Sequence, residues 1–216
     1  KKRCELFGKG GNCSFKDLSV ELVSMLAQAQ RAVTAQGMDR LLGTIGSVSA
    51  LKPNVIDKID FEAELAVVIG KPARKASRAE AMSHVAGYTV ANDYAIRDYL
   101  ENYYRPNLRV KNRDGGTVLG PWLVDAADVP DPHALALQTL VNGVVTQKGN
   151  TSDLITDIPA LIEYLSSFMT LNAGDVILTG TPDGVVNVNV GDEVVTEIDG
   201  IGRLVNTIVA DATFGR

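Results

Sequence analysis

The chain contains few cysteines and no long apolar run, and these two shortages exclude several classes of protein. Cys4 and Cys13 are its only cysteines, too few for a disulfide framework and not spaced as a zinc knuckle, so we expect a reducing compartment, the cytoplasm. The longest apolar run, around residues 65–70, falls far short of the roughly 20 residues that a membrane span needs. No apolar segment follows the basic start Lys1-Lys2-Arg3, so we expect no secretion signal.

A basic surface is also missing. The 216 residues carry a formal net charge of −5, and the sequence pI is about 5.1. Nucleic acids and anionic membranes select basic surfaces, so neither is expected as the main partner. What is present is an ordinary globular composition, with 45% hydrophobic and 22% charged residues, which is enough to bury a sizeable core. Small molecules therefore remain as the expected partners.

The hydrophobic pattern divides the chain into two parts. Over residues 15–42, apolar residues recur at steps of three and four, which predicts one amphipathic helix; they are Leu18, Leu22, Met25, Leu26, Ala29 and Val33. After Gly43 and Gly46 the pattern changes to short β-rich segments between turn signals. We therefore predict an N-terminal helical segment over residues 1–50 and a β-rich domain over residues 51–216.

The second part is predicted to contain many strands and few helices. Strands are expected over 60–69, 85–92, 135–141, 144–147, 176–179, 193–198 and 203–209, short helical segments over 78–84 and 93–100, and a helix over 159–169. Asn142-Gly143, between two of these strands, is the strongest short hairpin signal. The pattern is typical of a β-rich α+β fold.

Two acidic residues recur on the first of these strands. Because side chains alternate along a strand, Glu62 and Glu64 point to one face, opposite Phe61, Ala63 and Leu65. Adjacent carboxylates repel each other, and a bound dication would compensate both. An all-oxygen donor set suits Mg²⁺ or Mn²⁺ better than Zn²⁺. A solvent-facing strand edge is the commoner explanation of a bare Glu-x-Glu pair, and it stays open at this point.

Three further clusters contain chemically active side chains, and each has a structural alternative. Asp93 precedes Arg97 by four residues, which places both on one side of a helical turn, although Asp93 alone is also a normal helix cap. Residues 109–116 form a basic run around Lys111 that ends in glycines, which also fits a solvated loop. Residues 179–182, Thr-Gly-Thr-Pro, offer backbone amides and hydroxyls that can hold a carboxylate, or form a plain turn.

Taken in order along the chain, these segments resemble the fumarylacetoacetate hydrolase family. The resemblance covers about residues 52–210 and rests on Phe61-Glu62-Ala63-Glu64-Leu65, the run from Val85 to Asp93, Arg97-Asp98, Lys111, Gly120-Pro121-Trp122 and Thr179-Gly180-Thr181-Pro182. Each motif is weak alone, but this order is specific. The resemblance implies a mixed β-roll around a metal site with a few peripheral helices, assembled as a homodimer or a larger homo-oligomer.

The resemblance also implies roles for individual residues. Glu62, Glu64 and Asp93 would be the ligands of Mg²⁺ or Mn²⁺, Lys111 and Arg97 would be catalytic, and Arg97, Tyr104, Gly180 and Thr181 would bind the substrate. A metal held by these ligands would stabilise the enolate that forms when a proton or CO₂ leaves the substrate.

The region from Asn92 to Lys111 is most similar to one group within the family. Its members isomerise and decarboxylate a small diacidic 2-oxo or 2-hydroxydienoate acid in aromatic-compound catabolism, and the same activity is expected here. Two alternatives stay open. One is a carbon–carbon bond hydrolase of the acylpyruvate or fumarylacetoacetate type. The other is a metal-binding subunit without its own activity.

The chain departs from the family at the lid. Family members usually carry, before the Glu-x-Glu strand, a lid segment whose histidine and nearby glutamate act as an acid–base dyad. The two histidines here, His84 and His133, both follow that strand, and both are expected to be structural or surface residues. The lid is missing or replaced by residues 1–50, or a partner chain supplies it, or the sequence omits it. Tautomerisation needs less of this machinery than decarboxylation or hydrolysis.

Overall fold

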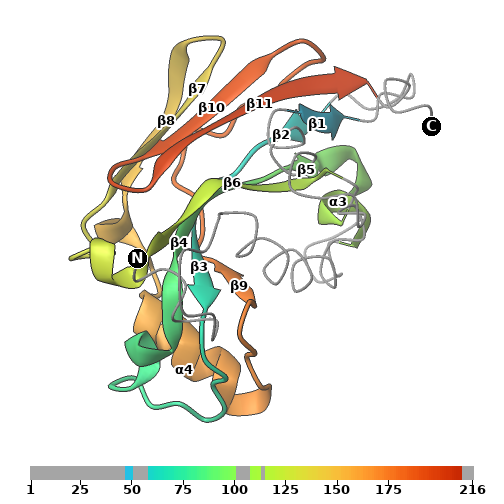
Figure 1. Ribbon diagram of the computed structural model, residues 1–216. Helices are drawn as coiled ribbons and strands as arrows, with labels where there is room; N and C mark the ends of the chain where they lie inside the picture. The colour runs from blue at the N-terminus through green and yellow to red at the C-terminus, as the bar shows by residue number, and fades with distance from the viewer. Residues whose placement is uncertain (1–46, 51–57, 101–107, 113–114, 211–216) are drawn as a thin grey trace, which may run out of the picture.

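The computed structural model of this chain describes residues 47–50, 58–100, 108–112 and 115–210. They form two β-sheets, a short two-stranded ribbon and a few helices (Figure 1). The helix predicted over residues 15–42 lies outside the described residues, as does most of the segment predicted over residues 1–50. No helix in the described ranges is long and apolar enough to cross a membrane.

Two sheets contain most of the strands. The first is antiparallel with the order β6-β4-β3-β9, and its strands are β3 (Ala63–Ile69), β4 (Val85–Asp93), β6 (Thr117–Asp125) and β9 (Val176–Leu178). The second has the order β1-β11-β10-β7-β8, and its strands are β1 (Ser47–Ala50), β7 (Ala136–Val141), β8 (Val144–Asn150), β10 (Glu193–Ile198) and β11 (Gly202–Ala210). Strands β1 and β11 pair in parallel, and the sheet is therefore mixed.

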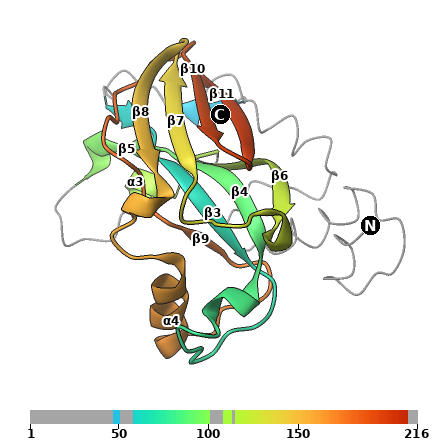
Figure 2. The same ribbon diagram turned by 90° about the vertical axis from the view of Figure 1, so that its left-hand side faces the viewer.

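Helices are few and peripheral. The longest described helix, α4 (Ile158–Phe168), lies at the end of the molecule away from the five-stranded sheet (Figures 1 and 2). The others are α3 (Leu108–Lys111) and the 3₁₀ turns η2 (Ala81–His84), η3 (Arg97–Tyr99), η4 (Ala126–Asp128) and η5 (Thr151–Asp153). The predicted β-rich α+β architecture is confirmed.

One hydrophobic core joins the two sheets. Every residue of β3 is buried, and in β4 all residues but Asp93 are buried. The core side chains include Leu65, Val67, Tyr88 and Val90 of the four-stranded sheet and Val194, Leu204 and Ile208 of the five-stranded sheet. Burial on both faces explains why β3 and β4 contain nearly continuous apolar runs.

Several predicted elements are confirmed. The hairpin forms between β7 and β8, with Asn142 and Gly143 both at positive φ, 50° and 81°, as a tight hairpin turn requires. The helix predicted over residues 159–169 is α4, and Pro159 lies in its first turn. The three C-terminal strands are β9, β10 and β11.

Two predictions differ from the structure near the acidic residues. The strand predicted over 60–69 is interrupted, because β2 (Ile59–Asp60) pairs with β5 (Ala95–Ile96) as a separate ribbon before β3 begins. The helical turn predicted over 93–100 is wrong. Strand β5 and the single 3₁₀ turn η3 occupy this region, because the N–H of Asp93 bonds to the carbonyl of Glu62 at 2.9 Å and extends the β-type pairing.

Helix α4 offers a test of local stability. The Oδ1 of Asp157 accepts a hydrogen bond from the N–H of Ala160 at 2.9 Å, and Asp157 also pairs with the exposed Arg78. We expect Asp157→Ala to lower the free energy of unfolding by about 1 kcal/mol, the usual cost of losing an N-cap. Arg78→Ala leaves the cap in place and should cost about 0.5 kcal/mol or less, as is typical of exposed ion pairs.

The cap should also depend on pH. The bond from Ala160 holds the pKa of Asp157 below its ordinary value. The stabilisation is therefore present above the ordinary aspartate pKa and is lost as the pH falls through the lowered one. Urea unfolding of both variants at neutral and acidic pH checks these expectations. Equal losses in the two variants at neutral pH would contradict the capping role.

Candidate metal centre

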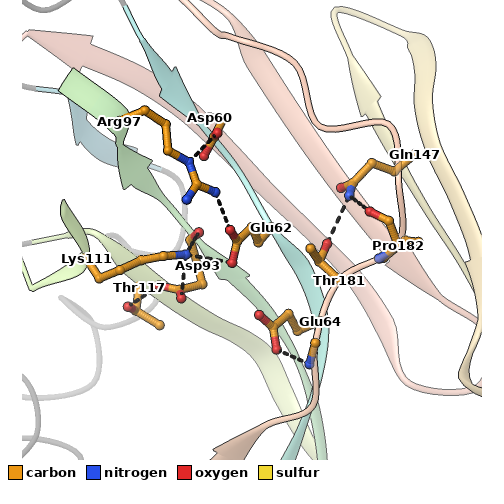
Figure 3. Close-up of polar contacts among 11 residues, drawn as sticks. Asp60, Glu62, Glu64, Asp93, Arg97, Lys111, Thr117, Gln147, Thr181 and Pro182 are labelled. Atoms are coloured by element: carbon orange, nitrogen blue, oxygen red, sulfur yellow. Dashed lines mark hydrogen bonds and ion pairs between the residues drawn. The ribbon is translucent and has the colours of Figure 1, made fainter. Parts of the chain in front are cut away.

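Three carboxylates converge where the β2–β5 ribbon meets the four-stranded sheet (Figure 3). Glu62 lies on the link between β2 and β3, Glu64 on β3, and Asp93 at the end of β4. The register pairs Ala63 with Asn92, which brings Glu62 opposite Asp93. One carboxylate oxygen of each residue lies within 4.8 Å of the other two. The structure thus brings together the three residues that the sequence predicts as metal ligands.

Glu64 is the most buried of the three, with 5% of its surface exposed. Its Oε2 accepts a hydrogen bond from the N–H of Gly180 at 2.5 Å. Burial raises the pKa of Glu64 to about 7, the bond from Gly180 opposes this shift, and the negative charges of Asp93 and Glu62 add to it. A carboxyl group in this position is stabilised in its charged form by a cation.

Lys111 extends from α3 into the space between two of these carboxylates. Its Nζ donates to Oε2 of Glu62 at 2.6 Å and to Oδ2 of Asp93 at 2.9 Å. Oδ1 of Asp93 also accepts from the hydroxyl of Thr117 at 3.0 Å. The side chain of Lys111 is 17% exposed, so its ammonium group acts in a partly desolvated site where charge interactions are strong.

Arg97 contacts the site from η3. Its Nε donates to Oδ2 of Asp60 at 2.7 Å, and its Nη2 donates to Oε1 of Glu62 at 2.5 Å. Burial lowers the pKa of Arg97, but the bonds and charges of Asp60 and Glu62 outweigh it and leave that pKa raised. The helical turn that was expected to place Arg97 and Asp93 on one side does not form, because the intervening residues include β5.

Residues 179–184 border the site on the side opposite Lys111 and Arg97 (Figure 3). Gly180 bonds to Glu64, and the hydroxyl of Thr181 accepts a hydrogen bond from Nε2 of Gln147 at 2.9 Å. The carboxylate that this Thr-Gly-Thr-Pro turn holds is thus one of the protein's own. Tyr104, which the family resemblance assigns to the substrate, lies outside the described residues.

Sequence reasoning missed three residues of the site. Asp60 supports Arg97, Thr117 supports Asp93, and Gln147 supports Thr181. Asp60 had a usable signal, because acidic residues recur at 60, 62 and 64. Gln147 and Thr117 had none, since their contacts join segments that are distant in the sequence.

The residues present fit a hard dication. Two oxygens on an octahedral Mg²⁺ lie about 3 Å apart in adjacent positions and about 4 Å in opposite positions. The separation of at most 4.8 Å among Glu62, Glu64 and Asp93 comes close to this without a metal. Among the residues that the structure describes, the site holds four carboxyl groups, with Asp60 included, against the two cations Lys111 and Arg97, and a dication would balance the excess.

The raised pKa of Glu64 predicts how metal binding depends on pH. Below about pH 7 the metal-free protein holds a proton on Glu64 that a bound cation must displace. We therefore expect the affinity for Mn²⁺ to rise as the pH increases to about 7 and to level off above it, with a proton released at the acidic end. Calorimetric titration in two buffers of different ionisation enthalpy counts that proton. A pH-independent affinity would contradict the prediction.

The sequence is similar to proteins of one family. The family model described as fumarylacetoacetate (FAA) hydrolase C-terminal matches residues 17–209. A 4-hydroxyphenylacetate degradation bifunctional isomerase/decarboxylase from Salmonella dublin is 64% identical over 163 residues, which are 76% of this chain and 38% of that protein. The chain thus spans about two fifths of the length of this relative. The family match begins at residue 17, inside the N-terminal segment predicted over residues 1–50. The predicted boundary between that segment and the β-rich domain stays a prediction.

Solved structures share the fold. A 2-hydroxyhepta-2,4-diene-1,7-dioate isomerase from Mycobacterium marinum matches with a TM-score of 0.71 and 41% identity, over 77% of this chain and 64% of that one. A fumarylpyruvate hydrolase from Pseudomonas aeruginosa, in complex with Mn²⁺ and pyruvate, matches with a TM-score of 0.71 and 32% identity, over 76% of this chain and 72% of that one. Because the family model covers most of the sequence, this chain belongs to the fumarylacetoacetate hydrolase family.

Proposed function

We propose that this chain isomerises and decarboxylates a small diacidic 2-oxo or 2-hydroxydienoate acid of aromatic catabolism, with Mg²⁺ or Mn²⁺ bound. The observation that carries the proposal is the cluster of Glu62, Glu64 and Asp93, in which one carboxylate oxygen of each residue lies within 4.8 Å of the other two. The similarity to the isomerase/decarboxylase of 4-hydroxyphenylacetate degradation supports the reaction class.

The three carboxylates would hold the dication, and each is fixed by a neighbour. Gly180 orients Glu64, Thr117 orients Asp93, and Lys111 bridges Glu62 and Asp93. When bound, the metal supplies Lewis-acid stabilisation of negative charge that develops on the substrate.

Lys111 is proposed to provide charge and a proton. Its Nζ lies 2.6 Å from Oε2 of Glu62 and 2.9 Å from Oδ2 of Asp93, and its side chain is mostly buried. An ammonium group in this position stabilises negative charge on the substrate and can exchange a proton with it. Both tasks are required when a dienol is converted into its oxo tautomer.

The substrate carboxylates are proposed to meet Arg97 and the 179–184 loop. Within the described part of the chain, the contacts of Arg97 with Asp60 and Glu62 use two of its five N–H donors, which leaves donors for a planar carboxylate. The hydroxyl of Thr181 would bind the same molecule from the opposite side of the site. Gly180, which the family resemblance assigns to the substrate, gives its N–H to Glu64 and would therefore only border the substrate. Tyr104 is proposed as a further contact on the strength of the family resemblance alone.

A carbon–carbon hydrolase is the second candidate, and the similarity to the fumarylpyruvate hydrolase favours it. Hydrolysis requires a positioned water and a base. Neither histidine of the chain offers that base at the site, because Nδ1 of His84 faces the carbonyl of Lys71 at 3.3 Å and Nε2 of His133 accepts from the N–H of Ile158 at 3.2 Å. Tautomerisation, which needs fewer groups, has the better support.

The setting of the enzyme is also part of the proposal. We propose that it works in the cytoplasm, since two cysteines fit a reducing compartment. We further propose a homodimer or larger homo-oligomer, as the family resemblance implies.

Turnover of 2-hydroxyhepta-2,4-diene-1,7-dioate, followed by loss of the dienol absorbance, tests the proposed function. The assay is run with Mg²⁺, with Mn²⁺ and with excess chelator. Metal-dependent loss of absorbance is expected. Release of pyruvate from an acylpyruvate, without isomerisation, would favour the hydrolase. Tight metal binding without turnover of either substrate would instead indicate a metal-binding subunit that serves another chain.

A further inference from the structure

Residues 179–184 run between the metal site and strand β8. On the metal side, the hydroxyl of Thr179 donates to the carbonyl of Leu65 at 2.8 Å, and the N–H of Gly180 donates to Glu64. On the β8 side, the loop meets Gln147, of which only 1% is exposed (Figure 3). Hydrogen bonds therefore fix this loop on both sides, and on the β8 side the buried polar residue is Gln147.

Gln147 bonds to two successive residues of this loop. Its Nε2 donates to Oγ1 of Thr181 at 2.9 Å and to the carbonyl oxygen of Pro182 at 2.7 Å. Its Oε1 accepts from the hydroxyl of Thr139 at 3.1 Å. Because the carbonyl of Pro182 can only accept, the nitrogen of the amide must face the loop and the oxygen must face Thr139.

The orientation of this amide fixes the direction of the Thr181 hydroxyl. Gln147 donates to Oγ1 of Thr181, so the proton of that hydroxyl points to another acceptor. Thr181 lies between Gln147 and the three carboxylates (Figure 3), so its hydroxyl proton is available to an oxygen bound on the carboxylate side. A donor suits a carboxylate or a 2-oxo oxygen, both of which accept.

The hydrogen bonds in the core behind Gln147 have the same donor-to-acceptor direction. Nδ2 of Asn92 donates to Oγ1 of Thr196 at 3.2 Å, and Thr196 and Thr139 lie 3.4 Å apart at their hydroxyl oxygens. Since Thr139 gives its proton to Gln147, Thr196 must donate to Thr139. All the bonds from Asn92 to Thr181 then point the same way, and bonds aligned in this manner polarise one another. Asn92, Thr139 and Thr196 are fully buried, so water does not reach this series of hydrogen bonds.

The loop also lies against β8 at van der Waals distance. A Cβ atom built on Gly149 would lie 2.8 Å from Cβ of Pro182. Gly184 has a φ of 102°, and a Cβ built there would lie 2.2 Å from the carbonyl oxygen of Thr146. Both glycines permit this approach, and the close contact keeps the amide of Gln147 within reach of the loop.

We propose that Gln147 is a positioning residue that sets the Thr181 hydroxyl as a donor to an acceptor oxygen of the substrate. The proposal rests on the proposed function, because it takes Thr181 as a contact of a 2-oxo diacid. Gln147 does not touch the substrate. It acts through Thr181, and it selects ligands that carry an oxygen acceptor at this point.

A double-mutant cycle tests the role. Gln147→Met removes the amide, and Thr181→Val removes the hydroxyl with little change of shape. We expect each single variant to weaken binding of 2-oxoheptanedioate, measured by calorimetry with saturating Mn²⁺, by about 10-fold to 100-fold. In the Thr181→Val background, Gln147→Met should weaken binding of the diacid by no more than about a further twofold. Additive losses would overturn the proposal.

Further measurements separate positioning from a structural effect. We expect KM to rise more than kcat in Gln147→Met, while the affinity for Mn²⁺ changes by about twofold or less. Gln147→Glu keeps the shape but replaces the donor by an acceptor, so it should bind the diacid at least as weakly as Gln147→Met. The matched control is Gln138→Met on the neighbouring strand β7, which loses a bond to Glu197 and should bind normally. Normal binding by both Gln147 variants would overturn the proposal.

Failure of the proposed function gives a different result. A wild-type protein that binds the diacid without turnover, with the cycle intact, would reject the reaction and keep the role of Gln147. Turnover with additive losses in the cycle would reject the role alone.

Discussion

Glu64→Gln is expected to lower both the affinity for Mn²⁺ and kcat/KM by at least about 100-fold. Loss of a partner one shell away from a metal already costs about 10-fold to 100-fold in affinity or activity, and loss of a ligand should cost more. Glutamine keeps the shape of the side chain and still accepts the bond from Gly180, so the local fold is preserved. Calorimetry with Mn²⁺ and the dienol assay measure the two effects.

The matched control is Glu193→Gln, an exposed carboxylate on β10 in the other sheet. It removes one negative charge and should leave Mn²⁺ affinity and turnover unchanged. An equal loss in both variants would mean that general electrostatic attraction, and not ligation, holds the ion. Unchanged Mn²⁺ affinity in Glu64→Gln would contradict the assignment of Glu64 as a ligand.

The same substitution should have the opposite effect on stability without metal. The pKa of Glu64 is raised from 4.5 to about 7, chiefly by burial, so the folded protein holds this proton more tightly than the unfolded chain. The free energy of unfolding of the metal-free wild type therefore falls as the pH rises from about 4.5 to about 7. Above about pH 7 this contribution does not change further. In Glu64→Gln this loss should be absent, and thermal unfolding in chelator at both ends of the range would reveal it.

The meeting of the three candidate ligands was predictable because it depends on local geometry and on the resemblance. Alternation along a strand places Glu62 and Glu64 on one face, and the two carboxylates still meet across the break between β2 and β3, where the carbonyl of Glu62 pairs with the N–H of Asp93. The motif ending at Asp93 matched the family, and antiparallel pairing of β3 with β4 then brings it opposite Glu62. The strand edge alternative for the pair is wrong, since Glu64 is buried.

The surroundings of the ligands were less predictable because they depend on long-range pairing. Arg97 was expected next to Asp93 on a helical turn, but pairing of Ala95 with Asp60 pulls the segment into β5 and turns Arg97 toward Asp60. Gln147 lies on the strand predicted over residues 144–147, so its place on β8 was predicted, but its burial was not. Its amide contacts Thr181 and Pro182, which lie more than 30 residues away in the sequence, and no pattern in either segment predicts that contact.

Lys111→Met should separate metal binding from chemistry. We expect kcat/KM to fall by about 100-fold to 10,000-fold, the usual contribution of a positioned acid or base. The affinity for Mn²⁺ should be equal or higher, because the ammonium group now occupies Oε2 of Glu62 and Oδ2 of Asp93, which are candidate ligand atoms. Mn²⁺ titration and the dienol assay on the same sample give both values. Lys148→Met, which removes an exposed lysine of β8, is the matched control.

The sign of the change in metal affinity decides what Lys111 does. If Lys111 only holds Glu62 and Asp93 together, its loss must weaken Mn²⁺ binding and activity in parallel, and this outcome would contradict a chemical role. Lys111→Arg then separates charge from proton transfer, because arginine keeps the positive charge but does not give up its proton near neutral pH. Activity restored by arginine would assign charge stabilisation to Lys111. Activity still lost, with Mn²⁺ bound, would assign the proton transfer, since a fixed cation stabilises charge but cannot complete a tautomerisation.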